Sequence, residues 1–217
     1  MSADAVLVGL VGETPVLDEF PLGPLLARRL RACTWPGAIA VDVEAMNWGA
    51  LHIVQGLEGR RGAHSRAVLV ACTDHGGAPG EIRLGRWTHE EMATLPLQQR
   101  IFEAVTGIVS LDNLLVIGEH FKVWPAEVLT VEVQAAESLF GEMASILAEA
   151  QSAGSEPDWG ARIGFAPVAV LAAIEQAVLR GVTEPNVADG WSARGLSAFA
   201  PAQSWHIVSS QSAPALH

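Results

Sequence analysis

Cysteine is scarce in this sequence of 217 residues. Cys33 and Cys72 are the only two, and they lie far apart along the chain. Two distant cysteines exclude the disulfide framework of small secreted domains, and they also exclude a Cys-x-x-Cys metal or redox pair. This cysteine usage is typical of a reducing compartment, so we expect a cytoplasmic protein.

Positive charge and long apolar runs are also lacking. Lys and Arg total 13 against 24 Asp and Glu, which gives a formal net charge of -11. A surface with this excess repels phosphate backbones and anionic lipids, so we expect neither a nucleic-acid nor a membrane partner. No segment approaches the roughly 20 apolar residues of a membrane span. Residues 1–15 are too poor in Lys and Arg for a secretory signal.

Apolar residues, in contrast, make up 50% of the chain, enough to bury the core of one domain. Short continuous apolar runs, typical of strands buried on both faces, alternate with segments of helical periodicity. The runs expected to form strands are residues 5–11, 38–45, 66–73 and 128–134, and residues 81–87 fit an edge strand that pairs antiparallel. This alternation predicts an α/β fold of three α/β/α layers around a mostly parallel but mixed, twisted sheet.

The helical periodicity also indicates where the domain ends. The expected helices are residues 23–34, 48–59, 97–109, 111–123, 139–150 and 166–181. Five tryptophans are expected to pack in the core or at its rim, namely Trp35, Trp48, Trp87, Trp124 and Trp159. Beyond residue 181 the chain is rich in Ser, Ala, Pro and Gly and has no sustained period. We therefore expect a domain over residues 1–181 and a flexible C-terminal tail over residues 182–217.

Several familiar catalytic motifs are missing. The chain has no GxSxG nucleophile elbow and no GxxxxGK[ST] phosphate loop, and THEEM at residues 88–92 lacks the second histidine of HExxH. Gly9 and Gly12, at the end of the first strand, suggest a dinucleotide-binding turn, but the third glycine of that motif is absent. A nucleotide cofactor is therefore the weaker interpretation.

Acidic residues and one histidine follow the ends of three predicted strands. They are Asp18 and Glu19, then Glu44, then Asp74 with His75. The carboxyl ends of parallel strands meet at one edge of a sheet, where open α/β sheets bind ligands. Carboxylates and an imidazole that meet there can hold a divalent cation such as nickel, manganese or zinc. The same acids also suit solvated loops and helix N-termini, so the spacing leaves both interpretations open.

Three segments at these strand ends share a pattern of glycines and acids. They read GETPVLDE at residues 12–19, EAMNWGAL at residues 44–51 and VACTDHGGAPGEI at residues 70–82. The segments resemble the nickel-iron hydrogenase maturation endopeptidases, whose pattern runs GxGNxLxxDDGxG, then DGGTxGxxLL, then VDAxxxGxxPGTV. Shorter similarities follow at residues 125–128 and 164–168. The resemblance covers residues 5–181, with an insertion at about residues 142–161.

The resemblance implies a function and a set of site residues. Members of that family remove a C-terminal extension from the precursor of a hydrogenase large subunit, and the nickel belongs to that precursor. Carried over by position, Glu19 and Glu44 would bind the metal, with Asp18 beside them. Asp74 or His75 would complete the metal shell or act as the catalytic base.

One position of the family pattern leaves a second interpretation open. The family's Ser-x-His motif falls near Ser110-Leu111-Asp112, where no histidine stands. The alternative is a non-catalytic relative that serves as an assembly chaperone or partner-binding subunit for the hydrogenase large subunit.

Overall fold

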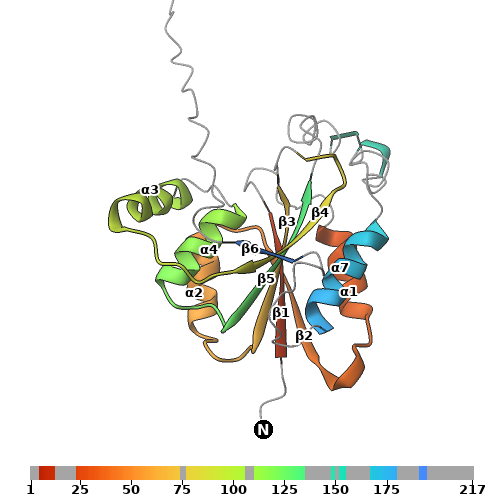
Figure 1. The fold of residues 1–217 in the computed structure, drawn as a ribbon. Helices are drawn as coiled ribbons and strands as arrows, with labels where there is room; N and C mark the ends of the chain where they lie inside the picture. The colour runs from red at the N-terminus through yellow and green to blue at the C-terminus, as the bar shows by residue number, and fades with distance from the viewer. Residues whose placement is uncertain are drawn as a thin grey trace, which may run out of the picture.

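A computed structural model of the chain places one sheet between two layers of helices (Figure 1). The structure describes residues 5–12, 23–73, 77–105, 110–134, 148–149, 152–154, 167–179 and 191–194. The strands are β1 (Ala5–Val11), β2 (Ala40–Met46), β3 (Arg66–Thr73), β4 (Ile82–Trp87), β5 (Glu127–Gln134) and β6 (Trp191–Arg194). The helices are α1 (Gly23–Ala32), the short 3-10 helix η2 (Pro36–Ala38), α2 (Ala50–Glu58), α3 (Thr94–Val105), α4 (Leu111–His120) and α7 (Pro167–Leu179).

The sheet has the strand order β2-β1-β3-β5-β4-β6. Strands β2, β1, β3 and β5 run parallel to one another, whereas β4 is antiparallel to β5. The mostly parallel, mixed sheet expected from the sequence is therefore confirmed. Continuous apolar runs form its central strands because both faces of a parallel sheet are covered by crossover helices.

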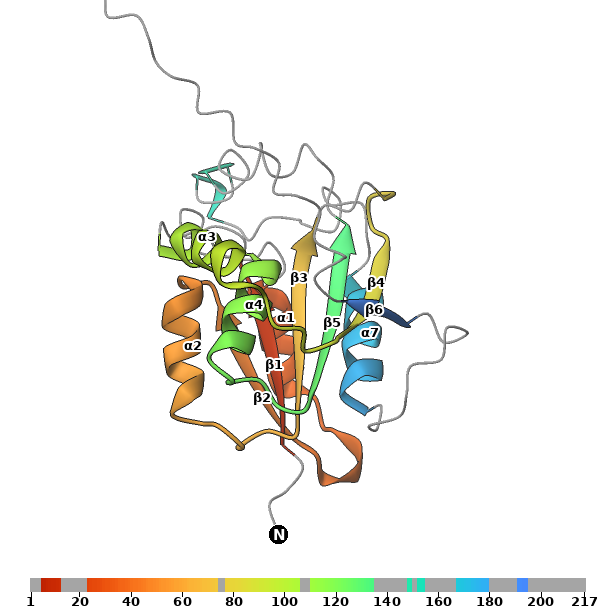
Figure 2. The same cartoon turned by 60° about the vertical axis from the view of Figure 1, so that its left-hand side comes forward.

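Side chains of the central strands alternate between two cores. On β1, Val6, Val8 and Leu10 pack with α1 and α7, whereas Leu7 and Val11 pack with α2 and α4 on the opposite face. This period of two is the pleat of a strand, and it places one helix layer on each face (Figure 2). The three-layer α/β/α architecture is confirmed.

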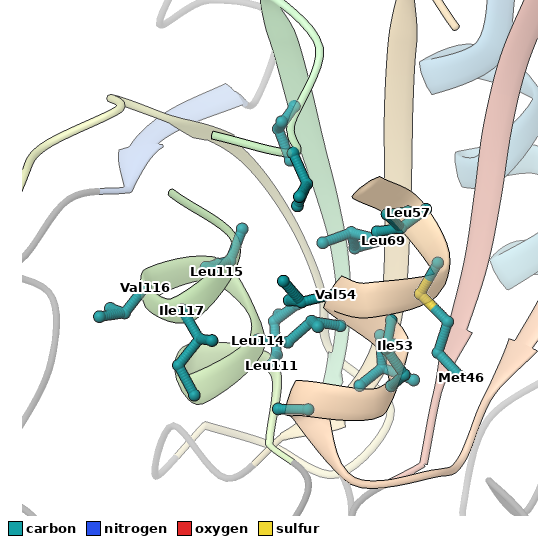
Figure 3. Packing of buried hydrophobic residues seen from close by; sticks show 14 of the residues in the cluster. Met46, Ile53, Val54, Leu57, Leu69, Leu111, Leu114, Leu115, Val116 and Ile117 are labelled. Atoms are coloured by element: carbon teal, nitrogen blue, oxygen red, sulfur yellow. The ribbon is translucent and has the colours of Figure 1, made fainter. Parts of the chain in front are cut away.

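One of the two cores lies between the sheet and the helices α2, α3 and α4. Figure 3 shows α4 and α2 meeting through Leu114, Ile117 and Val54, with Leu69 of β3 beneath them. Burying each side chain of this size is worth about 1.5–3 kcal/mol relative to leaving it exposed. This packing fixes α2 and α4 against the sheet, so the loops at their ends have defined starting points.

One strand lies inside the segment expected to be a flexible tail. Trp191–Arg194 form β6, which pairs in parallel with β4. The antiparallel pairing of β4 with β5 is confirmed, but β4 is not at the edge of the sheet, because β6 lies outside it. These four residues are too few to show an alternation of polar and apolar side chains. Their strand conformation comes from hydrogen bonds to β4.

Helix boundaries differ from expectation by a few residues. Helix α4 ends at His120 rather than at residue 123, because Lys122 adopts a left-handed backbone with φ of 53° that no helix continues through. Helix α3 begins at Thr94, before the expected start. The helix expected over residues 139–150 and the insertion at about 142–161 lie mostly outside the described residues.

Two of the tryptophans expected to pack have opposite outcomes. Trp87 is 2% exposed and belongs to the core, as expected. Trp48 was expected to join the apolar stripe of the following helix, but its side chain is 66% exposed because α2 begins only at Ala50. Trp48 therefore precedes the helix instead of packing beneath it.

Candidate functional site

The candidate site is the edge of the sheet where β1, β2 and β3 end. Val11, the last residue of β1, is in register with Met46 of β2 on one side and Ala71 of β3 on the other. The amide of Gly12 donates to the carbonyl of Met46 at 3.0 Å and closes the β1–β2 ladder. The segments that follow these strands therefore begin next to one another.

The order of the strands makes this edge a topological switch point. The chain passes from β1 to β2 on one side and then returns to β3 on the other side of β1. Helices α1 and α2, which make these two connections, pack on opposite faces of the sheet. Doubly wound sheets bind ligands at such a switch point, which here lies between β1 and β3.

Four of the five predicted site residues follow two of these strands in the sequence. Asp18 and Glu19 follow β1, and Asp74 and His75 follow β3, and all four fall outside the described residues. Their roles as metal ligands and catalytic groups stay predictions.

Glu44, the fifth predicted site residue, lies in β2 and binds an arginine. Both of its carboxylate oxygens accept hydrogen bonds from the guanidinium of Arg60, one of them over 2.9 Å. Arg60 lies just beyond the C-terminal end of α2, and the side chains of Arg60 and Glu44 are 39% and 32% exposed. A bidentate pair of this kind has a specific geometry, but the surrounding water weakens the attraction between its charges.

The strand position of Glu44 explains why it faces α2. Asp42, Glu44 and Met46 alternate along β2, and Met46 is buried in the core beneath α2. Asp42 contacts His64 at 2.8 Å, so both acids of this face bind the α2–β3 connection. The hydrogen bond to Glu44, together with the charges of Glu44 and Asp42, raises the pKa of Arg60 despite partial burial. The carboxylate of Glu44 therefore lies below the edge of the sheet rather than at its rim.

The segment where the family's Ser-x-His motif falls, residues 110–112, forms the start of α4. Ser110 precedes α4, and its hydroxyl accepts a hydrogen bond from the amide of Asn113 at 3.1 Å. Leu111 is 1% exposed and belongs to the core. Ser110 thus accepts a hydrogen bond from an amide in the first turn of α4, and the side chain of Leu111 packs in the core.

The loop after β3 is fixed at its far end by the last residue of β5. Gln134 lies opposite Thr73, and its side-chain oxygen accepts from the amide of Gly77 at 3.3 Å. Its backbone pairs with Gly80 and Glu81 at 2.9 Å and 2.8 Å. A side chain on Gly77 would approach the Glu81 carboxylate to 2.5 Å, so glycine suits this close approach. Gln134 therefore holds both Thr73 and the described residues from Gly77 onward.

A line of buried polar side chains on β5 was not identified by sequence reasoning. Thr130, Glu132 and Gln134 share one face of the strand and are almost fully buried. The hydroxyl of Thr130 donates to Glu132 at 2.7 Å, and Glu132 is in register with Ala71 of β3. The signal was present as polar residues at alternate positions of VLTVEVQ. Glu132 is thus a buried carboxylate near the carboxyl edge.

A second buried carboxylate, Glu119, lies away from this edge. It accepts hydrogen bonds from the Trp87 indole at 3.1 Å and Lys122 at 3.1 Å, and it contacts the His89 ring at 2.8 Å. Burial raises the pKa of Glu119, but hydrogen bonds from Trp87, Lys122 and His89 outweigh it and hold the pKa below its ordinary value. Trp87 ends β4, which runs opposite to its neighbour β5, so this cluster is at the other end of the sheet. It joins the β4–α3 connection to α4 and has a structural role.

The glycines after the first strand do not form a phosphate-binding turn. Gly9 lies within β1, and a side chain there would approach the sulfur of Met46 to 2.5 Å and Leu69 to 2.9 Å. Close packing accounts for this glycine. Gly9 therefore lies inside a strand and does not serve as the first glycine of a dinucleotide-binding turn.

Two further findings concern metal binding and membrane spans in the described part of the chain. Within it, no three or more His, Cys, Asp and Glu side chains are grouped closely enough to hold a metal ion. Among the same residues, no helix has the length and apolar character needed to traverse a lipid bilayer.

Comparisons with known proteins identify similar solved structures. No family model and no curated protein matches the chain. Hydrogenase 2 maturation peptidase from Thaumarchaeota archaeon is 13% identical, with 69% of this chain and 97% of that chain covered and a TM-score of 0.34. The hydrogenase 3 maturation protease is 20% identical over 62% and 75% of the two chains, with a TM-score of 0.38. Endopeptidase HycI from Escherichia coli is 23% identical over 76% and 97%, with a TM-score of 0.35. The chain is thus similar to hydrogenase maturation peptidases of known structure.

Proposed function

We propose that this protein is a divergent hydrogenase maturation endopeptidase that removes a C-terminal extension from a nickel-iron hydrogenase large-subunit precursor. Its substrate is a polypeptide that already carries nickel. The proposal rests on the sequence resemblance over residues 5–181. One structural observation carries it: Val11 is in register with both Met46 and Ala71, so the segments with the predicted site residues start side by side.

The proposed chemistry is hydrolysis of a peptide bond assisted by the substrate's nickel ion. The ion polarises the scissile carbonyl or lowers the pKa of a water so that it attacks at neutral pH. Glu19 and Glu44 hold the ion, with Asp18 beside them, and Asp74 or His75 completes the shell or takes the proton of the water. Nickel accepts such carboxylate and imidazole ligands.

Glu44 can take this role without releasing Arg60. A carboxylate offers about four lone-pair positions, and the two hydrogen bonds from Arg60 use two of them. The remaining positions stay free for a metal ion, and ligating carboxylates are commonly held by a hydrogen-bonding partner behind them. Arg60 is therefore proposed to orient Glu44 rather than to compete with the metal.

The test is the intact mass of a candidate precursor co-expressed with this protein. Wild-type protein is expected to shorten the precursor at its C-terminus, and Glu19→Gln and Glu44→Gln are expected to abolish the mass change. Asp42→Asn is the matched control, because Asp42 is an exposed acid on the same strand and contacts His64 of the α2–β3 connection. Cleavage that is unchanged in both Gln variants would exclude these residues.

The same experiment separates the second candidate function. The observation behind it is that residues 110–112, where the family's Ser-x-His motif falls, contain no histidine, which suits a relative that binds the precursor without cutting it. A stable complex of unchanged precursor mass would support an assembly chaperone and overturn the peptidase.

A further inference from the structure

Three large apolar side chains of α3 are exposed. Leu95, Phe102 and Val105 are 77%, 70% and 65% exposed. The charged residues of this helix, Arg100 and Glu103, pair with each other at 3.2 Å, and Arg100 also donates to the buried Asn113 of α4 at 3.1 Å. Leu97 and Ala104 pack in the core, so α3 has apolar side chains on its buried side and, beside the exposed Gln98 and Gln99, on its solvent side.

Trp48 extends this face beyond the helix. Its side chain is 66% exposed and lies on the short segment between β2 and α2. The adjacent Gly49 lies against α3, because a side chain on it would be 3.7 Å from the carbonyl of Ala104, the neighbour of Val105. Trp48, whose ring centroid is 5.9 Å from that of His52 on α2, is therefore next in sequence to a residue at the C-terminal end of α3. We call Trp48, Leu95, Phe102 and Val105 the α3–Trp48 surface.

This surface borders the candidate site. Trp48 follows Met46, the last residue of β2, by two positions, and β2 ends at the carboxyl edge. Figure 2 shows α3 at the end of the sheet toward which β3 and β5 point. A polypeptide bound at the carboxyl edge on the α2 side therefore passes the α3–Trp48 surface.

Apolar exposure on this scale identifies an interaction surface. Single exposed apolar residues are ordinary, but a contiguous group of large ones is a common mark of a protein contact. Tryptophan is also one of the residue types that most often dominate binding energy. The surface itself is uncharged, whereas the chain carries a net charge of -11. That excess attracts a partner with basic residues around its apolar contact.

We propose that the α3–Trp48 surface docks the polypeptide substrate, through an apolar segment of that substrate flanked by basic residues. This inference rests on the proposed function and adds the place and chemistry of substrate recognition. Docking at this surface holds the substrate beside the carboxyl edge while its C-terminal extension enters the site. The surface determines affinity, and the predicted site residues determine cleavage.

The test measures binding and cleavage separately with a purified, fluorescently labelled large-subunit precursor. The double substitution of Trp48→Ser and Phe102→Gln is expected to weaken binding at least tenfold, and the association rate of the wild type is expected to fall as salt rises. Val168→Gln is the matched control, because Val168 is equally exposed, at 66%, on α7 over the opposite face. Circular dichroism and the thermal midpoint of the variants should match the wild type, since all three side chains are exposed.

The outcomes distinguish failure of the docking from failure of the proposed function. A wild-type protein that neither binds nor cuts the precursor would overturn both. A wild-type protein that cuts it, together with a double variant that binds as tightly, would overturn the docking alone. Light scattering that finds a dimer of the free protein, dissociated by the double substitution, would assign the surface to a second copy of this chain instead.

Discussion

The pair of Glu44 and Arg60 allows a structural role to be separated from a catalytic one. Replacing Glu44 with Gln or Arg60 with Met removes one partner, and the double variant closes a thermodynamic cycle. Because both side chains are more than 30% exposed, the pair's Coulomb energy is screened. We expect a coupling energy of about 0.5–1 kcal/mol, which corresponds to roughly 1–4 °C in the thermal midpoint of a domain of this size. Raising the salt concentration to about 1 M, where the screening length is about 3 Å, should reduce this coupling.

Precursor cleavage should not follow these stability changes. If Glu44 holds the nickel of the substrate, Glu44→Gln removes a ligand and should lower the cleavage rate by more than about 100-fold, whereas Arg60→Met removes only the partner behind the ligand and should cost about tenfold. Thermal denaturation and intact-mass kinetics on the same four proteins give both quantities. Equal losses of cleavage in the two single variants, in proportion to their stability, would refute the ligand role and leave Glu44 as an anchor for the α2–β3 connection.

Four further predictions concern stability. Gly118→Ala should destabilise the protein by about 1–2 kcal/mol in urea unfolding, because the new side chain would meet the Trp124 ring at 2.5 Å and overpacking exceeds the gain in helix propensity. Gly56→Ala, in a helix with open space around that position, should instead stabilise the protein by about 0.5–1 kcal/mol. A stability change of the same sign in Gly118→Ala and Gly56→Ala would contradict the packing described for Gly118. Glu119→Ala should cost about 1–3 kcal/mol because the buried Trp87 indole loses its acceptor, and a cost near zero in urea titration would refute this role. The pKa of Glu119 is lower in the folded protein than its ordinary 4.5, so its contribution is present above that pH and is lost as the pH falls through the folded value. Glu119→Gln should therefore lose less stability than the wild type on acidification, as measured by unfolding at a series of acid pH values.

Much of the sheet could be predicted from the sequence because its central strands are continuous apolar runs. Ala5–Val11 and Arg66–Thr73 match the expected ranges, because each strand consists mainly of a continuous apolar run. Strand β6 could not be predicted, because its four residues depend on pairing with β4. Local pattern carries no information about a partner more than 100 residues away in the chain.

The candidate site was predictable in position but less so in detail. The carboxyl edge follows from where the apolar runs end, and β1, β2 and β3 are indeed neighbours there. The bond between Glu44 and Arg60 was not predictable, since it depends on where α2 ends and how the chain turns toward β3. The exposure of Trp48 was missed for a related reason, because α2 starts two residues after it and the helical periodicity gave no sign of that boundary.

The pairing of β4 with β6 also affects the order of assembly during synthesis. Leu84 pairs with Trp191, so the outer side of β4 lacks this partner until Trp191–Arg194 have left the ribosome. The parallel strands β1, β2, β3 and β5, by contrast, are complete by Gln134. During this interval the nascent protein exposes an open strand edge that another chain can join, and the arrival of β6 closes it.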